Sequence, residues 1–340
     1  MRISDKPYAH QFFLVGVFFL ANGFLISDVS ANQDSEYSPD INIFVPKSIT
    51  LSDSIFLDNN DNRWDAVKIS GEISNSWNLA ADLSYWTLDE PQPVEALPGN
   101  QSLEPFTGYR GTVKASIRAT NRINFTGELG FYDWSDQDAG WIGSLSSIAT
   151  VGQGSLTFRL HRDQLLELDS SYDALIEEIE YKALDISLWT PLGSQSGFYG
   201  SVSIATLTDD NNRSSTYMSL TTQPWGTHKI NVGVSLFAIG FNDPSVLYWS
   251  PELDGSLSLI ADAAFSVKPS WEIKVGGSVG QAFSKQDTDL DFDSSSYSLL
   301  IVSEWTVNNY IIAIGGSEDR SLSDSPYEAR TFLLSLKRSF

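Results

Sequence analysis

The stretch that decides the fold is "RTFLLSLKRSF", residues 330–340. Apolar side chains of one parity stand at Phe332, Leu334, Leu336 and Phe340. Polar side chains of the other parity stand at Thr331, Ser335, Lys337 and Ser339, and Leu333 is the exception. Successive side chains of a strand point to opposite faces, whereas the ends of soluble domains usually fray into small polar residues. The sequence therefore predicts an amphipathic last strand, and the fold depends on what its apolar face meets.

The same alternation continues upstream in other strand-length stretches. Residues 113–120 and 123–132 alternate and are joined by a tight turn at Asn121–Arg122. Further alternating stretches are 67–74, 77–86, 184–189, 257–267 and 271–280. Because the period is that of a strand throughout, helical repeats and solenoids are not supported.

The connections between these stretches come in two sizes. Short turns are expected at 75–76, 121–122, 151–153, 191–195, 224–226, 268–270 and 308–309. Longer acidic loops, rich in Asn and Ser, are expected at 88–105, 133–140, 208–213 and 284–296. Outer-membrane barrels have short periplasmic turns and longer extracellular loops. The pattern therefore predicts an all-β, transmembrane antiparallel barrel.

The number of strands follows from counting backwards from the last one. If every short turn is periplasmic and every longer loop is extracellular, the count requires a strand at about 140–150 and a first strand within 41–57. It predicts about sixteen strands, with both barrel ends periplasmic and the barrel spanning 41–340. Fourteen strands is the alternative, because 163–181 reads either as an extracellular loop with a helix or as a long strand extension.

The first residues have the layout of a secretory signal peptide. A weakly basic start with Arg2 and Lys6 precedes a mostly apolar run at 11–26, and small residues follow at 29–31. This predicts a signal peptide over 1–31 and a periplasmic segment over 32–40. The alternative is an uncleaved membrane helix, although the run is shorter than the roughly 20 residues that a span needs.

Composition narrows the class of protein further. The chain has no cysteine and a formal net charge of −22. The absence of cysteine excludes disulfides and thiolate metal sites and suits an exported protein. Nucleic acid is not an expected partner, because binding phosphates needs a basic surface. An acidic field instead favours neutral or cationic partners.

A barrel explains more of the sequence than a soluble β-sandwich, which would also alternate. Aromatic rings typical of membrane interfaces stand near strand ends at Trp64, Trp77, Trp141, Trp225, Trp271, Trp305 and Tyr310. The ending also resembles the terminal assembly signature of outer-membrane proteins at Phe332, Leu334, Leu336 and Phe340. Arg338 departs from that pattern and is expected near the interface, where a cation costs about 0–1 kcal/mol. The expected location is the bacterial outer membrane, with its lipid, lipopolysaccharide and the barrel-assembly machinery as partners.

A barrel of sixteen strands is wide enough for an aqueous lumen, and parity predicts which side chains line it. The charged candidates are Lys68, Glu72, Asp82, Lys114, Arg118, Glu128, Asp185, Asp262, Glu272, Lys274 and Glu304. The aromatic candidates are Trp86, Tyr132, Trp189 and Tyr199. The charges form either a solvated wall of paired groups or a mildly cation-favouring conduit. The aromatic rings either stack on sugars, or they have a structural role in an interfacial girdle or in packing against a plug inside the lumen.

Two stretches resemble exopolysaccharide-export barrels of the cellulose and poly-N-acetylglucosamine secretion families. Within 204–220 the resemblance rests on Asp209, Asp210, Asn211 and Arg213. Within 246–265 it rests on Tyr248, Trp249, Ser250 and Pro251, where Trp249 replaces the usual phenylalanine. The resemblance covers about 200–340 and implies sixteen strands. Those families usually carry helical repeats before the barrel, and this chain has only a short segment there. It therefore suits a barrel that works with a separate periplasmic scaffold and a glycan polymer.

Catalytic and metal-binding patterns are weak. His161 stands beside Arg162 and Asp163, but spacing alone does not define a catalytic triad. The acidic stretches 58–65 and 287–293 alternate Asp with other residues, yet 58–65 lacks the glycine and final glutamate of a calcium loop, and solvated loops are the simpler interpretation. No catalytic residue, metal or cofactor is expected.

Three functions remain open on the sequence alone. The leading hypothesis is a non-enzymatic outer-membrane channel that exports a neutral or partly cationic exopolysaccharide. The first alternative is a general or cation-selective diffusion porin, whose inward-folded constriction loop would be 88–105. The second alternative is a structural or scaffold barrel of a secretion system with a closed lumen.

Overall fold

The computed structural model describes most of the chain from residue 45 onward. The described residues are 45–58, 63–74, 78–89, 106–135, 137–165, 174–175, 177–224, 229–245, 247–248, 250–286, 289–321 and 328–340. The predicted signal peptide at 1–31 and the predicted segment at 32–40 lie outside these residues. Among the described residues, no helix is long and apolar enough to cross a membrane.

Sixteen strands make up the fold, as the turn pattern predicted. The first eight are β1 (Val45–Asp58), β2 (Arg63–Ser74), β3 (Asn78–Asp89), β4 (Phe106–Thr120), β5 (Ile123–Trp134), β6 (Gly140–Val151), β7 (Gly154–Gln164) and β8 (Glu180–Pro191). The second eight are β9 (Ser196–Leu207), β10 (Asn212–Thr222), β11 (Ile230–Phe241), β12 (Leu253–Lys268), β13 (Trp271–Gln286), β14 (Asp289–Val307), β15 (Tyr310–Ser321) and β16 (Glu328–Ser339). The strands required at 140–150 and within 41–57 are β6 and β1.

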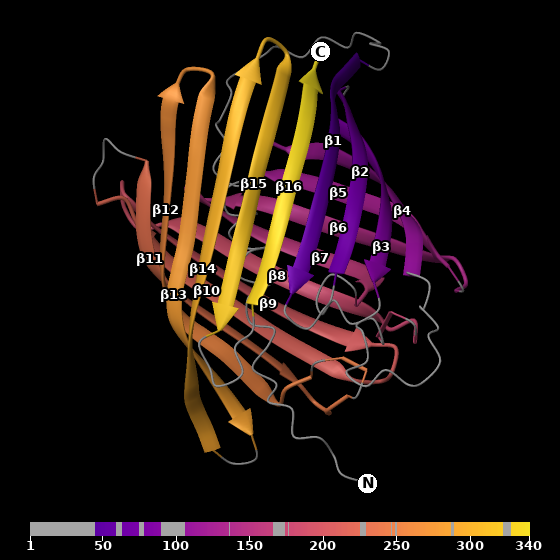
Figure 1. The fold of residues 1–340 in the computed structure, drawn as a ribbon, viewed down its shortest axis with the longest axis vertical. Helices are drawn as coiled ribbons and strands as arrows, with labels where there is room; N and C mark the ends of the chain where they lie inside the picture. Colours follow the sequence, from indigo (N-terminus) through magenta and orange to yellow (C-terminus); the bar gives the residue numbers. More distant parts are fainter. Residues whose placement is uncertain are drawn as a thin grey trace, which may run out of the picture.

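The strands form one closed antiparallel barrel, in which β1 pairs with β16. Figure 1 shows the indigo β1 beside the yellow β16. The register of this seam joins Ser48 to Ser339, and the backbone N–H of Phe340 donates to the carbonyl of Lys47 at 3.1 Å. The last strand is therefore an integral wall of the barrel, which explains its alternation.

The two ends of the barrel differ, although the longer loop predicted at 208–213 is only a four-residue turn, because β9 runs to Leu207 and β10 begins at Asn212. The short connections between β2 and β3, β4 and β5, β6 and β7, β8 and β9, β12 and β13, and β14 and β15 share one end with the start of β1 and the end of β16. The described parts of the longer connections lie at the other end. We call these the periplasmic and the extracellular ends, following the convention of outer-membrane barrels.

The prediction of a long extracellular loop over 284–296 was wrong. β13 continues to Gln286 and β14 begins at Asp289, so this stretch is an extended hairpin. The hairpin projects beyond the other strands at the lower left of Figure 1. Asp289, Asp291 and Asp293 alternate with Leu290 and Phe292, which is itself a strand pattern. The high content of aspartate concealed it.

The apolar parity of the strands forms the outer surface. In the last strand Phe332, Leu334 and Phe340 are each about half exposed, which suits contact with lipid. At the periplasmic end Trp271 and Trp305 stack on neighbouring strands, with ring centroids 6.1 Å apart. Such rings mark the membrane interface. Of the predicted interfacial aromatic residues, Trp141, Trp271, Trp305 and Tyr310 have the outward parity. Trp64 shares the inward parity of Lys68, and Trp77 and Trp225 lie outside the described residues.

Arg338 is accommodated at this interface by aromatic rings. Its guanidinium carbon lies 4.7 Å from the ring centroid of Phe340 and 5.6 Å from that of Tyr310. A cation over an aromatic face is attracted by the ring's quadrupole. The departure of Arg338 from an apolar ending thus has a local physical explanation.

Candidate functional site

The inner face of the barrel is the candidate functional site, and the strand registers place the predicted charged residues on it. Each of them has the parity opposite to the exposed apolar side chains of its own strand. These residues are Lys68, Glu72, Asp82, Lys114, Arg118, Glu128, Asp185, Asp262, Glu272, Lys274 and Glu304. They come from β2, β3, β4, β5, β8, β12, β13 and β14, so the charged lining covers much of the circumference.

Most of these charges have a partner across the strand ladder. Lys68 on β2 lies 3.2 Å from a carboxylate oxygen of Asp82 on β3. Lys274 on β13 bridges two acids, at 3.8 Å from Glu272 and 3.5 Å from Glu304. Charges that face each other in this way are consistent with a solvated wall of mutually screened groups.

Other charged side chains of the wall are held by hydroxyl, amide or imidazole groups. The Ser48 hydroxyl donates to Glu72 at 3.2 Å, and the Ser144 hydroxyl donates to Glu128 at 3.3 Å. The Asn231 amide donates to Asp262 at 2.7 Å. His161 Nε2 lies 2.9 Å from Asp185 Oδ2, so the histidine examined as a catalytic candidate is a partner of this lumen carboxylate.

Parity reasoning missed several inward charges. The additional basic residues are Arg110, Arg159, Arg213 and Lys337, and the additional acids are Asp163, Asp254 and Asp319. Lys337 has the polar parity predicted for the last strand, although it was not among the lumen candidates. The others belong to strands or strand ends that were not assigned from the sequence. With them the described inner wall keeps only a small acidic excess.

Arg110 and Asp163 form the most buried ion pair among those described. The guanidinium Nη2 of Arg110 on β4 lies 2.5 Å from Asp163 Oδ2 on β7, and their side chains are 12% and 7% exposed. This pair crosses β5 and β6 on the inside of the barrel. It joins the inner wall to the end of β7, where the chain leaves the sheet.

The four predicted lumen aromatic residues fall into two groups. Trp86 and Tyr132 pack near the extracellular end: Tyr132 is buried and donates to Glu180 at 2.6 Å, and Trp86 donates to Ser84 at 2.8 Å. Trp189 and Tyr199 lie directly opposite each other on β8 and β9 toward the periplasmic end. The sequence reading missed Tyr217, whose parity on β10 matches Ser215 and Ser219 and opposes Met218.

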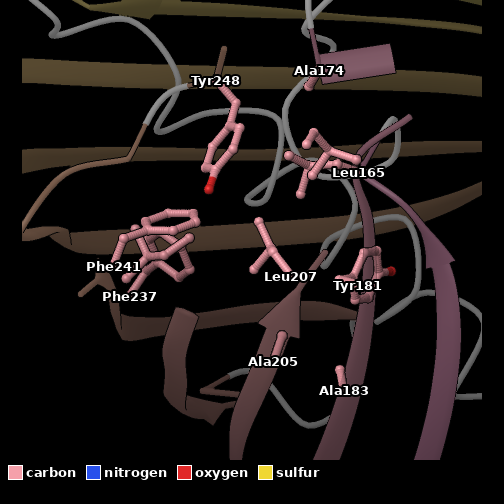
Figure 2. Packing of buried hydrophobic residues seen from close by; sticks show 11 residues of the cluster. Leu165, Ala174, Tyr181, Ala183, Ala205, Leu207, Phe237, Phe241 and Tyr248 are labelled. Atoms are coloured by element: carbon pink, nitrogen blue, oxygen red, sulfur yellow. The ribbon is translucent and has the colours of Figure 1, made fainter. Parts of the chain in front are cut away.

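An apolar patch covers part of the inner wall in the extracellular half. It consists of buried side chains of β8, β9 and β11, namely Tyr181, Ala183, Ala205, Leu207, Phe237, Ile239 and Phe241. The chain between β7 and β8 packs on it through Leu165, Ala174 and Ile179, as Figure 2 shows for the first two. Apolar side chains on an inner wall need such a cover, because a hydrated lumen would leave them in water.

We call Gln164, Leu165, Ala174, Leu175 and Ile179 the inner segment. Leu175 packs against Tyr132, Trp134 and Ile142 on β5 and β6, and Trp134 donates to Gln164 at 2.7 Å. The inner segment thus contacts the inner faces of β5–β6 and of β8–β11 in the extracellular half of the barrel. The structure places it within 163–181, in a connection that has two helical residues at Ala174–Leu175. The constriction loop expected at 88–105 lies outside the described residues, apart from the end of β3.

The two family-like motifs meet in space. Asn211 in the β9–β10 turn donates to the Tyr248 hydroxyl at 2.9 Å and to the Asp243 carbonyl at 2.7 Å. The Tyr248 hydroxyl in turn donates to Asp209 Oδ2 at 2.7 Å. We call Asp209, Asn211, Tyr248 and Asp243 the loop latch. It fastens the β9–β10 turn to the β11–β12 connection, beside the apolar patch to which Tyr248 belongs.

The remaining motif residues stabilise the same region. Asp210 has a φ of 67° at the turn, a conformation that favours glycine. The Ser250 hydroxyl accepts from the Ser245 N–H at 2.5 Å, and the Pro251 carbonyl accepts from the Phe241 N–H at 2.9 Å. Arg213 lies over the Tyr181 ring at 5.5 Å. Trp249 lies outside the described residues.

Burial sets the protonation state of Tyr248. Desolvation, followed by the hydrogen bond to the Asp209 carboxylate, raises the pKa of the Tyr248 hydroxyl well above its usual range. The phenol is therefore a hydrogen-bond donor at any physiological pH, and the loop latch does not titrate near neutrality.

Metal sites are not visible in the described part of the barrel. Within it, no group of three or more His, Asp or Glu side chains is placed to hold a metal ion. The acidic stretch 58–65 falls partly outside the described residues, as do the side chains of 287–293. The hypothesis of ion binding at those loops stays a prediction.

Comparison with known proteins gives a likeness of fold. No family model and no curated protein matches the sequence. Among solved structures, a bacterial polysaccharide outer membrane secretin matches with a TM-score of 0.66 at 12% identity, covering 86% of this chain and 98% of that one. Acinetobacter baumannii OccAB4 matches with a TM-score of 0.48 at 7% identity, covering 89% and 100%. Pseudomonas aeruginosa OccK9 (OpdG) matches with a TM-score of 0.47 at 9% identity, covering 87% and 98%. The chain has the fold of an outer-membrane β-barrel.

Proposed function

We propose that this protein is a non-enzymatic outer-membrane channel through which an exopolysaccharide leaves the cell. The observation that carries the proposal is the inner wall, which combines paired charges, hydroxyl groups and inward-facing aromatic rings. Such a lining can stay hydrated while offering a sugar chain both hydrogen bonds and ring faces. The likeness to a polysaccharide secretin agrees with this function as an analogy of fold.

The charges of the wall favour a polymer that is neutral or weakly cationic. Acids and bases of the wall lie opposite one another in ion pairs such as Lys68–Asp82 and Lys274–Glu304, and a small acidic excess remains. A polyanion would meet this excess unfavourably. A separate periplasmic scaffold would deliver the polymer, and the Phe340 ending would present the chain to the barrel-assembly machinery. Both partners belong to the proposal.

A diffusion porin is the second candidate, and one observation favours it. The inner segment packs on the inner wall of the extracellular half, which is the position that a constriction loop takes in the porin hypothesis. A porin of this kind would pass small solutes through the remaining lumen and would not distinguish glycan oligomers from other solutes of similar size.

Single-channel conductance of the refolded protein in a planar bilayer tests these functions. An export channel should give a steady current that oligomers of N-acetylglucosamine or glucosamine reduce. A current that is indifferent to both oligomers would favour the porin. Heat-modifiable migration shows whether the protein is folded. If folded protein gives no current, the open channel is contradicted and the scaffold barrel is the remaining hypothesis.

A further inference from the structure

One sector of the inner wall differs from the rest by its lack of charge. On β9, β10 and β11, the described inward positions between the level of Arg213 and the periplasmic end, Arg213 itself excluded, carry no Asp, Glu, Lys, Arg or His. Hydroxyl groups take their place at Ser201, Ser203, Ser215, Ser219, Thr221 and Ser235. The neighbouring walls carry the ion pairs described above, so this sector presents a neutral surface to the lumen.

Three aromatic rings cross this neutral sector. Trp189 on β8 pairs directly with Tyr199 on β9. The ring centroid of Tyr199 lies 6.0 Å from that of Tyr217 on β10, with the planes at 52°. Tyr217 in turn pairs with Phe237 on β11, where the apolar patch begins. The rings rise from near the periplasmic end of β8 and β9 to the middle of β10, along the direction that an exported chain would follow.

The first ring of this series is held against the wall. A Cβ atom on Gly197 would lie 3.5 Å from Trp189 Nε1, so the indole lies close over the bare backbone of Gly197. Trp189 is 38% exposed, so part of the ring remains open to the lumen. Tyr217 faces the lumen from the middle of β10, on the same face as the neighbouring pair Ser219 and Ser235.

We propose that Trp189, Tyr199 and Tyr217 form a stacking site for neutral hexopyranose rings near the periplasmic entrance of the lumen. This proposal rests on the function proposed above and names the class of its substrate. The apolar C–H face of a sugar packs on an aromatic ring, while its hydroxyl groups exchange hydrogen bonds with water and with Ser201, Ser219 or Ser235. The described inward positions of β9, β10 and β11 beyond Arg213 carry no carboxylate, and Asp185 on β8, which pairs with Ser203, already lies 2.9 Å from His161 Nε2. An ammonium group would therefore lose hydration on entering without gaining a free counter-charge on these strands.

Calorimetric titration of the refolded full chain in detergent with cellohexaose tests the stacking site. The wild-type protein should bind the oligomer saturably, with little dependence on salt, because no ion pair is formed. Trp189→Ala and Tyr199→Ala should each weaken binding by about tenfold, as expected from the loss of one ring contact. Trp189→Phe and Tyr199→Phe keep a ring and should retain most of the affinity.

Tyr85→Ala is the matched control, because Tyr85 on β3 is also an aromatic residue but belongs to the exposed outer face of the barrel. It should leave cellohexaose binding unchanged. Heat-modifiable migration verifies that each variant folds. Tighter binding of a cationic glucosamine hexamer than of cellohexaose would overturn the neutral class, and unchanged affinity in both alanine variants would overturn the site.

The stacking site and the conduit fail in different ways. A barrel that conducts but does not bind cellohexaose contradicts the stacking site alone. A barrel that is silent in the bilayer but binds cellohexaose through Trp189 and Tyr199 contradicts the export function alone.

Discussion

Asn211 and Tyr248 lie 37 residues apart in the chain, and the amide of the first donates to the hydroxyl of the second at 2.9 Å. Both side chains are buried, with exposed fractions of 4% and 5%. Buried polar groups of this kind are costly unless they are paired. The contact therefore fixes two extracellular connections relative to each other and holds Tyr248 against the apolar patch.

Tyr248→Phe should destabilise the folded barrel by about 1–3 kcal/mol, because the Asn211 amide and Asp209 carboxylate each lose a buried partner. The measurement is the temperature at which heat-modifiable migration is lost. Tyr297→Phe is the control, since that hydroxyl contacts Glu318 at 3.3 Å in a less buried setting. Equal midpoints for Tyr248→Phe and wild type would contradict the role of the loop latch.

The pH dependence of stability should show the raised pKa of Tyr248. A tyrosine whose pKa is higher in the folded state contributes stability that is complete below the unfolded pKa of about 10 and is lost as pH rises through the folded value. The contribution of the Tyr248 hydroxyl to the unfolding temperature should thus be constant from pH 7 to pH 9. It should decrease above about pH 10. Tyr248→Phe should reduce that alkaline fall; an identical fall in the variant would assign it to other groups.

Asp210→Gly should stabilise the β9–β10 turn by about 1 kcal/mol, because Asp210 has a φ of 67° and glycine adopts this conformation without a steric penalty. Asp138→Gly is the matched control in the β5–β6 connection, where φ is not positive. The control should be neutral or slightly destabilising. A loss of stability in Asp210→Gly would show that the carboxylate matters more than the backbone conformation.

The two ion pairs of the inner wall should differ in energetic weight. Arg110→Ala leaves Asp163 buried without its cation and should cost about 3–5 kcal/mol. Lys68→Ala removes a half-exposed partner of Asp82 and should cost about 0–1 kcal/mol. Urea unfolding of both variants measures the difference. Equal losses would mean that burial does not decide the strength of these pairs.

Ala174→Asp tests whether the inner segment narrows the lumen. A carboxylate at this 2% exposed position cannot stay in the apolar patch without a partner. The inner segment should leave the wall, and single-channel conductance should rise. Ala183→Ser, a mild change within the same patch on β8, is the control and should conduct like wild type. A destabilised Ala174→Asp barrel with unchanged conductance would show that the inner segment packs without narrowing the channel.

The wall of this barrel could be predicted from the sequence because its signals are local. Alternation gives each strand its faces, and turn length gives each connection its side, so the sixteen strands follow from counting. The prediction of a loop at 284–296 was wrong because the many acidic residues suggested a solvated loop, although the alternation through Leu290 and Phe292 indicates a strand. The inward charges at Arg110 and Asp163 were missed because the ends of their strands carry no clear turn signal.

The site could be predicted only in part, because much of it depends on contacts between distant segments. The inward parity of Trp189 and Tyr199 could be predicted from the sequence. Their proximity to Tyr217 could not, because it depends on the register between strands. Phe237, Ile239 and Phe241 face inward, which breaks the rule of polar lumen positions, and only the packing of Leu165 and Ala174 explains them. Likewise, nothing in the two motifs that contain Asn211 and Tyr248 predicts that these two side chains contact each other.

The seam between β1 and β16 has a consequence for how the chain folds. Every other strand pair in the barrel joins sequence neighbours, so hairpins can form one after another with little loss of chain entropy. The pairing of Ser48 with Ser339 instead closes nearly the whole chain into a ring, although the entropic cost of such closure grows only with the logarithm of its length. Until that step is complete, the sheet has two unpaired edges that can recruit other chains. Pairing of β1 with β16, the last step of closure, thus removes both unpaired edges and protects the barrel from aggregation.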